Sequence, residues 1–244
     1  MMKLIKSKIA EYLRRYPFLC KGLVSILQLN PLEKVYYNFT VLAKRPYFGH
    51  LFNANQVWST RRTVMLELIK SELNKSGLQY KIIEVGSWAG SSALLWAKAC
   101  KEKNKGIVFC IDTWQASQNA PDPMKQAVKN DRIYKLFLHN IETSGLKSYI
   151  VPLKGTSDII AEILQPEIFD FVYIDGDHAY AQFKKDLLNY MKIVKINGII
   201  CGDDLELFSD EIDNLNAKRH CEEDFIFDPK SKKYFHPGIT LGIR

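Results

Sequence analysis

The chain has 244 residues, of which 47% are apolar and 25% charged, and its formal net charge is +7 at pH 7. This composition is that of an ordinary soluble globular protein, and it excludes a disordered, collagen-like or fibrous chain. The longest apolar stretches hold about a dozen residues, whereas a bilayer crossing needs roughly 20, so the chain is not expected to span a membrane.

The five cysteines lie far apart in the sequence and form no CxxC pair. A disulfide framework or a zinc knuckle is therefore not expected, and a reducing compartment is favoured. The first residues also lack the pattern of a secretory signal, which predicts a cytoplasmic location.

The positive charge is concentrated at the start of the chain. Residues 1–70 hold twelve Lys or Arg and three Glu, a balance of +9, while residues 71–244 hold 22 basic and 24 acidic residues, a balance of −2. A basic region of this kind either solvates one face of the protein or binds an anionic surface. We expect no nucleic-acid partner.

Residues 1–58 are predicted to form an N-terminal extension of helices and a lid. An amphipathic helix is expected over residues 4–16, followed by a second apolar helix up to Leu29. These helices would pack on the rest of the chain, contact a membrane peripherally through residues 1–30, or form a homodimer contact. Residues 31–58 are rich in aromatic side chains without periodicity, which is typical of a lid or binding loop, or of a segment that covers core.

Residues 59–244 have a regular pattern and are predicted to form one domain. A helix from Ser59 to Leu73 is followed by strands that are apolar throughout, each separated from the next by a helix, which indicates a parallel sheet covered on both faces. We therefore predict a doubly wound α/β fold. The expected strands are Tyr80–Val85, Ile107–Ile111, Tyr149–Leu153, Phe169–Ile174 and Gly198–Cys201, and the helices between them span residues 91–102, 123–143, 157–164 and 180–194.

The C-terminal residues are predicted to end the sheet in the reverse direction. A polar helix from Ser209 to Cys221 is expected before two further strands, Asp224–Phe227 and Ile239–Ile243, with a turn at Pro229–Lys233. Two strands joined in this way form an antiparallel hairpin, here at the edge of the sheet.

The first chemical motif is IIEVGSWAGSS, residues 82–92, which indicates a strand, a glycine-bearing turn and a helix start. Ligands of open α/β sheets bind beyond the carboxyl ends of the strands, where such a turn lets the backbone approach a cofactor. Trp88 stands between Gly86 and Gly90, where a dinucleotide loop needs a small residue, and this argues against NAD. Glu84 at the strand end suits a cationic ligand better than phosphates. A tight turn with a purely structural role is the alternative.

The next two strands are followed by three candidates for contacts with a nucleoside. Asp112 ends the second strand, 22 residues beyond Gly90. A carboxylate there can accept both hydroxyls of a ribose, although it could also cap a turn. Trp114 is placed to lie against an adenine ring. Ser157, after the third strand, either caps the next helix or binds a base edge.

The fourth and fifth strands both end in acidic residues. The sequence FDFVYIDGDH places Asp175 at one strand end, and GIICGDD places Asp203 and Asp204 at the other. Because neighbouring parallel strands lie about 5 Å apart, these carboxylates can meet at one ion. Three unpaired carboxylates would repel one another, and a hard divalent cation with oxygen ligands resolves this. The alternative is that Asp203 and Asp204 bind only loop amides; Asp177 is interpreted as a helix cap.

Residues 80–204, about half of the chain, resemble the class I S-adenosylmethionine-dependent methyltransferases. The subgroup resembled ends its fourth strand in DGDHxY, and it includes small-molecule and sugar O-methyltransferases and cephalosporin-hydroxylase-like proteins. The resemblance implies a Rossmann-like, mostly parallel sheet of seven strands with a reversed last strand. It also implies which residues bind the cofactor: a loop of Glu84, Gly86, Ser87 and Gly90, Asp112 on the ribose, and Trp114 and Ser157 near the adenine.

A comparison with catechol O-methyltransferase and its relatives implies a magnesium site. Those enzymes hold the ion with an acid after strand four and a pair of residues after strand five, positions that are Asp175, Asp203 and Asp204 here. The catechol enzyme has an asparagine as the second member of the pair, so this chain departs in carrying a further acid. His178 stands where that enzyme has its catalytic lysine. The imidazole could accept a proton, or it could only bind the strand-five loop.

The sequence thus predicts an enzyme that transfers the methyl group of S-adenosylmethionine to the oxygen of a small hydroxylated acceptor, such as a sugar or natural product. Mg²⁺ or another divalent cation would assist, and Asp175 and His178 would be catalytic. Two alternatives stay open. One is methylation of a macromolecule, against which the lack of an Asn/Asp-Pro-Pro-aromatic signature after strand four counts. The other is a non-enzymatic nucleotide-binding module that docks through its basic N-terminal helix.

Overall fold

The computed structural model describes residues 31–55, 59–75, 77, 79–116 and 122–243, and the structural statements below refer to these residues. The amphipathic helix expected over residues 4–16, and its possible membrane or dimer contact, lie outside the described residues.

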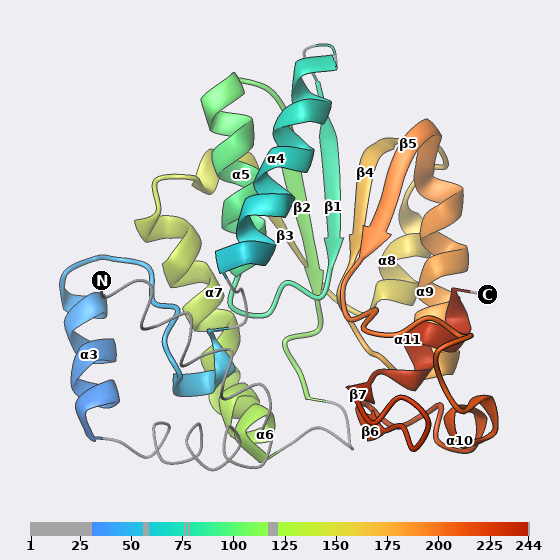
Figure 1. Ribbon diagram of the computed structural model, residues 1–244. Helices are drawn as coiled ribbons and strands as arrows, with labels where there is room; N and C mark the ends of the chain where they lie inside the picture. Colours follow the sequence, from blue (N-terminus) through green and yellow to red (C-terminus); the bar gives the residue numbers. More distant parts are fainter. Residues whose placement is uncertain (1–30, 56–58, 76, 78, 117–121, 244) are drawn as a thin grey trace, which may run out of the picture.

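Five strands form one fully parallel sheet in the order β3-β2-β1-β4-β5, shown with all arrows running in the same direction in Figure 1. The order reverses between β1 and β4, so these two neighbours form the switch point of a doubly wound sheet. The α/β fold predicted from the sequence is confirmed, with strand bounds within a few residues of those expected. The strands are β1 (Lys81–Val85), β2 (Ile107–Asp112), β3 (Ile150–Lys154), β4 (Phe169–Ile174) and β5 (Val194–Gly202).

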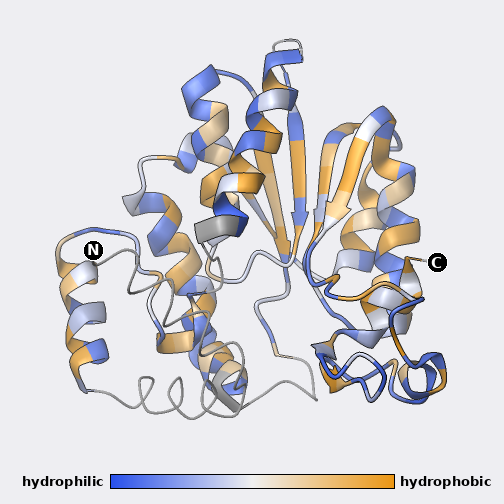
Figure 2. Ribbon diagram, viewed as in Figure 1, coloured by the Kyte–Doolittle hydropathy of each residue, from blue (hydrophilic) through white to orange (hydrophobic). Residues whose placement is uncertain are grey.

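The sheet has an apolar core on each face because successive side chains of a strand point to opposite sides. Ile82 of β1 packs in one cluster with Leu73 and Phe137, while its neighbour Ile83 packs in the other with Tyr190. The strands are therefore apolar along most of their length (Figure 2). The first face is covered by α4 (Ser59–Lys75), α5 (Ser91–Lys103) and α7 (Arg132–Thr143), and the second by α8 (Ser157–Ile163) and α9 (Tyr180–Ile193).

Part of the segment expected to be an irregular lid is helical. Residues 31–42 form α3 (Pro31–Leu42), which a proline can begin because the first-turn N–H groups have no helical partner. Further along, Tyr47 is fully buried, and the side-chain amide of Asn140 bonds its backbone N–H and its carbonyl, at 2.8 and 3.0 Å. This part of the segment covers core, which was the alternative expectation. Elsewhere in the chain, the helix expected over residues 123–143 is divided into α6 (Asp122–Val128) and α7 (Arg132–Thr143).

The predicted seventh strand is wrong. Residues 239–243 belong mostly to a helix, α11 (Pro237–Gly242), which Pro237 begins and in which Gly238 packs directly on the backbone carbonyl of His178. Two-residue strands β6 (Ile226–Phe227) and β7 (Tyr234–Phe235) form a separate antiparallel pair instead of extending the main sheet. The polar helix expected before them is shorter than predicted, α10 (Asn214–Arg219), because Asp213 caps it by accepting from two backbone N–H groups.

Among the described residues, no helix combines the length and the apolar character needed to cross a membrane.

Candidate active site

The loops after β1 and β4 touch each other at the switch point of the sheet. The backbone N–H of Asp175 donates to the carbonyl of Val85 at 2.8 Å. Gly86 has a left-handed φ of +89°, and a Cβ atom there would collide with the carbonyl of Asp175. Glycine is therefore required at this position both by its backbone angle and by the close approach of the neighbouring loop. The glycine loop and the first acid of the predicted metal group thus share one small region.

Glu84 and Ser87, both predicted to bind the cofactor, are bonded to each other. Glu84 is fully buried, and its carboxylate accepts from the Ser87 hydroxyl at 2.6 Å and from the Trp96 indole N–H at 3.2 Å. Burial raises the pKa of Glu84. These bonds fix the shape of the turn between Gly86 and Gly90, so the acid organises the loop from within.

Asp112 holds the loops after β1 and β2 together. One carboxylate oxygen accepts from the backbone N–H of Trp88 at 2.7 Å, and the other accepts from the backbone N–H of Trp114 at 2.6 Å. Burial raises the pKa of this carboxyl. Each oxygen still has a lone pair to offer, because a carboxylate can accept about four hydrogen bonds. The residue as a whole is partly exposed, and its carboxylate is chemically able to bind a pair of hydroxyls.

Trp114 lies in the core, which argues against its predicted place beside an adenine ring. Its side chain is 1% exposed and packs on Tyr134 and Phe137, with ring centroids 4.5 and 4.8 Å away. The indole N–H donates to the carbonyl of Trp88 at 2.8 Å. The ring therefore has no free face on which a base could stack.

Ser157 is the first residue of α8 and does not cap it. The cap is Thr156, whose side chain accepts from the backbone N–H of Ile159. The Ser157 hydroxyl donates to Asp186, the buried acid of α9, at 2.5 Å. Its bond to a carboxylate was not foreseen from the sequence.

Asp175, Asp203 and Asp204 converge as the sequence predicted, and we call these three residues the acid edge. One carboxylate oxygen from each lies within 4.8 Å of the other two. Their side chains are 21%, 26% and 27% exposed, so the group is reachable from solvent but largely shielded. All three follow the carboxyl ends of β4 and β5.

The positive side chain of Arg61, which was not predicted from the sequence, lies against the acid edge. The guanidinium of Arg61, on α4, forms ion pairs with Asp175, at 2.6 Å, and with Asp203. It also donates to the Tyr173 hydroxyl at 2.6 Å. No signal in the sequence marks Arg61, because it is one of two adjacent arginines in a helix 114 residues before Asp175.

The acid edge is able to exchange a proton near neutral pH. Burial and the charges of Asp204 and Asp203 raise the pKa of Asp175 to about 7, against the opposing effect of Arg61. A carboxyl with such a pKa is present in both its forms at pH 7, which suits a general base.

His178 lies between two carboxylates. Its Nδ1 is 2.6 Å from Asp224, and its Nε2 is 3.1 Å from Asp204. Although burial lowers it, the pKa of His178 is raised to about 10 by these two acids. The side chain is therefore an imidazolium at pH 7, and this argues against the predicted role as proton acceptor.

Two hollows of the described surface lie away from the acid edge. One of about 420 Å³ lies between α4 and α5 and includes Phe48, Arg62 and Ser91, beside the N-terminus of α5. Another of about 430 Å³ lies at the opposite end of the sheet, at Tyr80, Asn104 and Tyr149.

The doubly wound sheet, the glycine turn after β1 and the acids after β4 and β5 define a class of protein, the class I S-adenosylmethionine-dependent methyltransferases. Residues 83–205 match a family model described as a methyltransferase domain. This match covers about half of the chain. The chain therefore belongs to that methyltransferase family and is an S-adenosylmethionine-dependent enzyme.

Solved structures with a similar fold include three methyltransferase or cofactor-bound proteins. Cofactor-bound Rv0187 from MTB is 14% identical, with a TM-score of 0.47 over 77% of this chain and 72% of the other. The O-methyltransferase of tomaymycin synthesis from Streptomyces achromogenes, in complex with S-adenosylmethionine, is 13% identical, with a TM-score of 0.45 over 62% and 57%.

The methyltransferase from Agrobacterium tumefaciens is 11% identical, with a TM-score of 0.45 over 60% of this chain and 46% of the other. This chain thus spans less than two thirds of two of the three proteins. Because all three likenesses are distant, family membership rests on the family model. No curated protein sequence is significantly similar to the chain.

Proposed function

We propose that the protein is an O-methyltransferase that acts on a small hydroxylated acceptor, such as a sugar or a natural product. The observation that carries this proposal is the contact between Gly86 of the glycine turn and Asp175 of the acid edge. It joins a loop suited to a nucleoside cofactor to a group of carboxylates suited to a hydroxyl donor. Neighbouring sites of this kind are what a transfer from a sulfonium to an oxygen requires.

For the cofactor, we assign the loop of Glu84, Gly86, Ser87 and Gly90, with Asp112 on the ribose hydroxyls. Glu84 shapes the loop through Ser87, and its negative charge lies close to where a cationic cofactor would bind. The free lone pairs of Asp112 accept the hydroxyls. Ser157 lies near the adenine only if its hydroxyl gives up Asp186, which makes it the weakest of the cofactor assignments.

The acceptor hydroxyl donates its proton at the acid edge. We assign proton acceptance to Asp175, because its pKa lies near 7, and not to His178, which is already protonated at that pH. As the proton moves to Asp175, the acceptor oxygen attacks the methyl carbon, and the carbon–sulfur bond breaks to leave a neutral thioether. Holding the two reactants in line supplies most of the acceleration, with effective molarities of about 10⁵–10⁸ M in well-oriented systems.

A divalent cation at Asp175, Asp203 and Asp204 is part of the proposal. The donor set fits a hard ion such as Mg²⁺, because three carboxylate oxygens converge. When bound, the ion would lower the pKa of the acceptor hydroxyl and also that of Asp175, which is one of its own ligands, so that the hydroxyl would need only a weak base. Arg61 supplies positive charge to the same carboxylates and must withdraw before the ion can enter.

The experiment that tests the function measures methyl transfer from labelled S-adenosylmethionine to a panel of sugars and phenols, with and without Mg²⁺. Asp175→Asn should lower kcat by about 10²–10⁴-fold, the usual contribution of a general base. Cofactor affinity, measured by calorimetry, should not change. Asp177→Asn is the matched control, because its carboxylate lies in the same loop and, among the described residues, accepts from the backbone N–H of Ala179. Equal activity in the two variants would reject the role of Asp175.

The cytoplasmic location predicted from the sequence also remains a proposal. It is supported by the free thiols of Cys100 and Cys110, which are buried in the core and form no disulfide. Membrane and homodimer contacts through residues 1–30 stay proposals from the sequence alone.

A further inference from the structure

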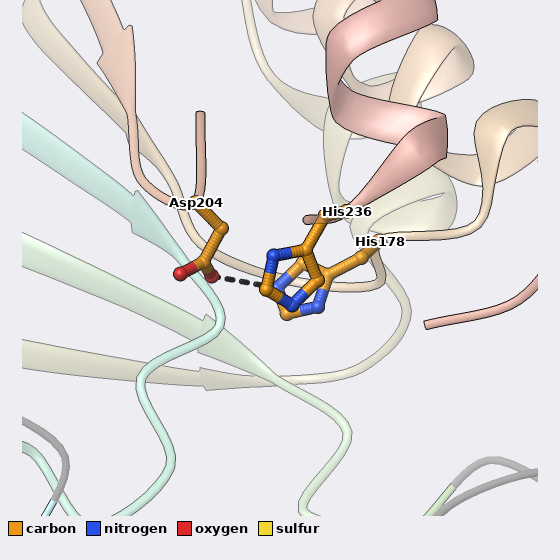
Figure 3. A group of neighbouring side chains, drawn as sticks. All are labelled: His178, Asp204 and His236. Atoms are coloured by element: carbon orange, nitrogen blue, oxygen red, sulfur yellow. Dashed lines mark ion pairs between the residues drawn. The ribbon is translucent and has the colours of Figure 1, made fainter. Parts of the chain in front are cut away.

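Asp204 of the acid edge also meets two histidines, as Figure 3 shows. His178 follows β4, Asp204 follows β5, and His236 immediately precedes α11. One potential ligand atom from each lies within 4.8 Å of the other two. The side chains are 20%, 27% and 12% exposed, so they form a shielded cluster with access to solvent.

Each of the two imidazoles is held at Nδ1 by a further carboxylate. His178 Nδ1 is 2.6 Å from Asp224 Oδ1, and His236 Nδ1 is 2.9 Å from Glu206 Oε1. A histidine that binds a metal ion almost always donates its other ring N–H in this way, which fixes the tautomer and the ring orientation. In both histidines this leaves Nε2 as the nitrogen that would bind an ion, and on His178 the ion would replace the proton that Asp204 and Asp224 otherwise hold there.

The Nε2 atom of His178 is buried and makes no well-directed hydrogen bond within the described residues. Asp204 Oδ2 nevertheless lies 3.1 Å away. The contact is an ion pair that does not meet the geometry of a well-directed hydrogen bond. Ligand atoms at about 2.0–2.2 Å from one ion are roughly 3.0–3.5 Å from each other. The separation therefore fits two ligands of one ion as well as the ion pair of the metal-free protein.

The charge around the cluster also favours a cation. Three carboxylates, those of Asp204, Asp224 and Glu206, surround two imidazoles. Carboxylates that gather around one point favour a counter-charge, which the proton on His178 supplies without metal and a divalent ion would supply in its place. Arg61, the cation of the acid edge, forms its ion pairs with Asp175 and Asp203 and has none with Asp204.

We propose that His178, Asp204 and His236 form a site for a transition-metal ion of the Zn²⁺ or Co²⁺ type. Imidazole nitrogens select such ions, whereas an all-oxygen group such as the acid edge suits Mg²⁺. Three protein ligands leave a further coordination position open, which is the arrangement of ion sites that bind a water or a substrate atom. The site goes beyond the proposed methyl transfer, since its ligands converge whether or not Asp175 acts as a base.

Co²⁺ is the probe that tests the site, because it reports its ligands through visible absorption. The chelator-treated full chain is titrated with Co²⁺ at pH 8, by absorption and by calorimetry. One ion per chain should bind, with a spectrum typical of mixed nitrogen and oxygen ligands, and Zn²⁺ should displace it. His178→Ala and His236→Ala should each weaken binding by more than about 100-fold, and Asp224→Asn by about 10–100-fold, the usual cost of losing an outer partner.

His220→Ala is the matched control. Among the described residues, the His220 imidazole pairs with Glu223 alone, and that side chain is exposed. If His236→Ala proves unfolded by thermal melting, His236→Gln keeps a polar side chain there without an imidazole. Binding that is unchanged in both histidine variants would overturn the proposal. So would a Co²⁺ ion that is lost in Asp175→Asn but not in His178→Ala.

The two proposals fail separately. A chain that binds Co²⁺ through the histidines but methylates no hydroxylated acceptor contradicts the proposed function and supports the site. Methyl transfer in a chain whose histidine variants bind Co²⁺ normally contradicts the site and supports the function.

Discussion

The glycine loop after β1 and the acid edge after β4 and β5 are neighbours, but they hold their charges in different ways. Glu84 is bonded by the Ser87 hydroxyl and the Trp96 indole N–H, and Asp112 ties this loop to the next one through the backbone N–H groups of Trp88 and Trp114. Asp175 is bonded by Arg61, 114 residues away. The glycine loop is therefore held by neutral donors of its own and of adjoining elements, whereas the acid edge depends on a long-range cation that another cation is able to replace.

The largest effect is expected where the two regions touch. Gly86→Ala would place a methyl group against the carbonyl of Asp175 and force alanine to a φ of +89°. The strain alone is on the order of 1–3 kcal/mol. A displacement of about 1 Å at a reacting group typically costs 100-fold in rate. We expect methyl transfer and cofactor affinity both to fall by about 100-fold or more.

The control for this variant is Gly77→Ala, because a Cβ at Gly77 meets nothing within 4 Å. Cofactor titration calorimetry and a methyl-transfer assay compare the two. Near-normal cofactor affinity in Gly86→Ala would contradict the close approach of the two loops.

The next effect concerns the charge of His178 and its dependence on pH. The pKa of His178 is raised to about 10 from an ordinary value near 6.5. The proton on His178 therefore stabilises the fold fully below pH 6.5, and this stabilisation is lost as pH rises towards 10. The upper bound is about 5 kcal/mol, at 1.36 kcal/mol for each pKa unit.

Urea unfolding of the chelator-treated chain from pH 6 to pH 10 measures this loss. The difference in unfolding free energy between the wild type and His178→Gln should shrink as pH rises. A difference that stays constant over this range would show that His178 does not carry the charge.

A smaller effect is expected for Arg61→Gln, which removes the resident cation of the acid edge. Breaking a fully buried ion pair costs about 3–5 kcal/mol, and the 21–26% exposure of these side chains reduces that to roughly 2 kcal/mol. Mg²⁺ should bind roughly tenfold more tightly, because the competing charge is gone.

Arg62→Gln changes the same charge on the exposed side of α4 and serves as the control. Calorimetry with Mg²⁺ and urea unfolding are the two measurements. Unchanged Mg²⁺ affinity in Arg61→Gln would show that Arg61 and the ion do not compete.

The smallest effect is expected for Ser157→Ala. The loss of the hydrogen bond to Asp186 should cost about 1 kcal/mol of stability. Gln182 also donates to Asp186, so the buried acid keeps a partner. Cofactor affinity should change less than threefold if the hydroxyl stays on Asp186. A loss of tenfold or more would place Ser157 on the cofactor, as the family resemblance implies.

The sheet and the positions of Asp175, Asp203 and Asp204 were predictable because they depend on local patterns. Apolar runs mark β1 to β5, and the carboxyl ends of neighbouring parallel strands meet at one edge of a sheet. Residues 239–243 misled because their alternating Ile and Leu also fit a strand. Pro237 begins a helix there, and the packing of Gly238 on His178 holds it in place.

Other parts of the site depend on contacts that no local pattern shows. Arg61 reaches the acid edge only through the packing of α4 on α5, and His236 meets His178 only because α11 folds back onto the loop after β4. The place of Trp114 could not be predicted for a different reason. An aromatic residue after a strand suits a stacked base and a core equally well, and only its burial against Tyr134 decides between them.

The shortened sheet has a consequence for solubility. Among the described strands none pairs with the outer side of β5, and an open strand edge invites pairing with another molecule. The register between β4 and β5 shifts, so that Phe169 opposes Val194 while Phe171 opposes Ile199. The bulge between them carries Lys195 and the left-handed Asn197. A kinked border of this sort resists addition of a foreign strand, so the irregularity disfavours aggregation through the edge of the sheet.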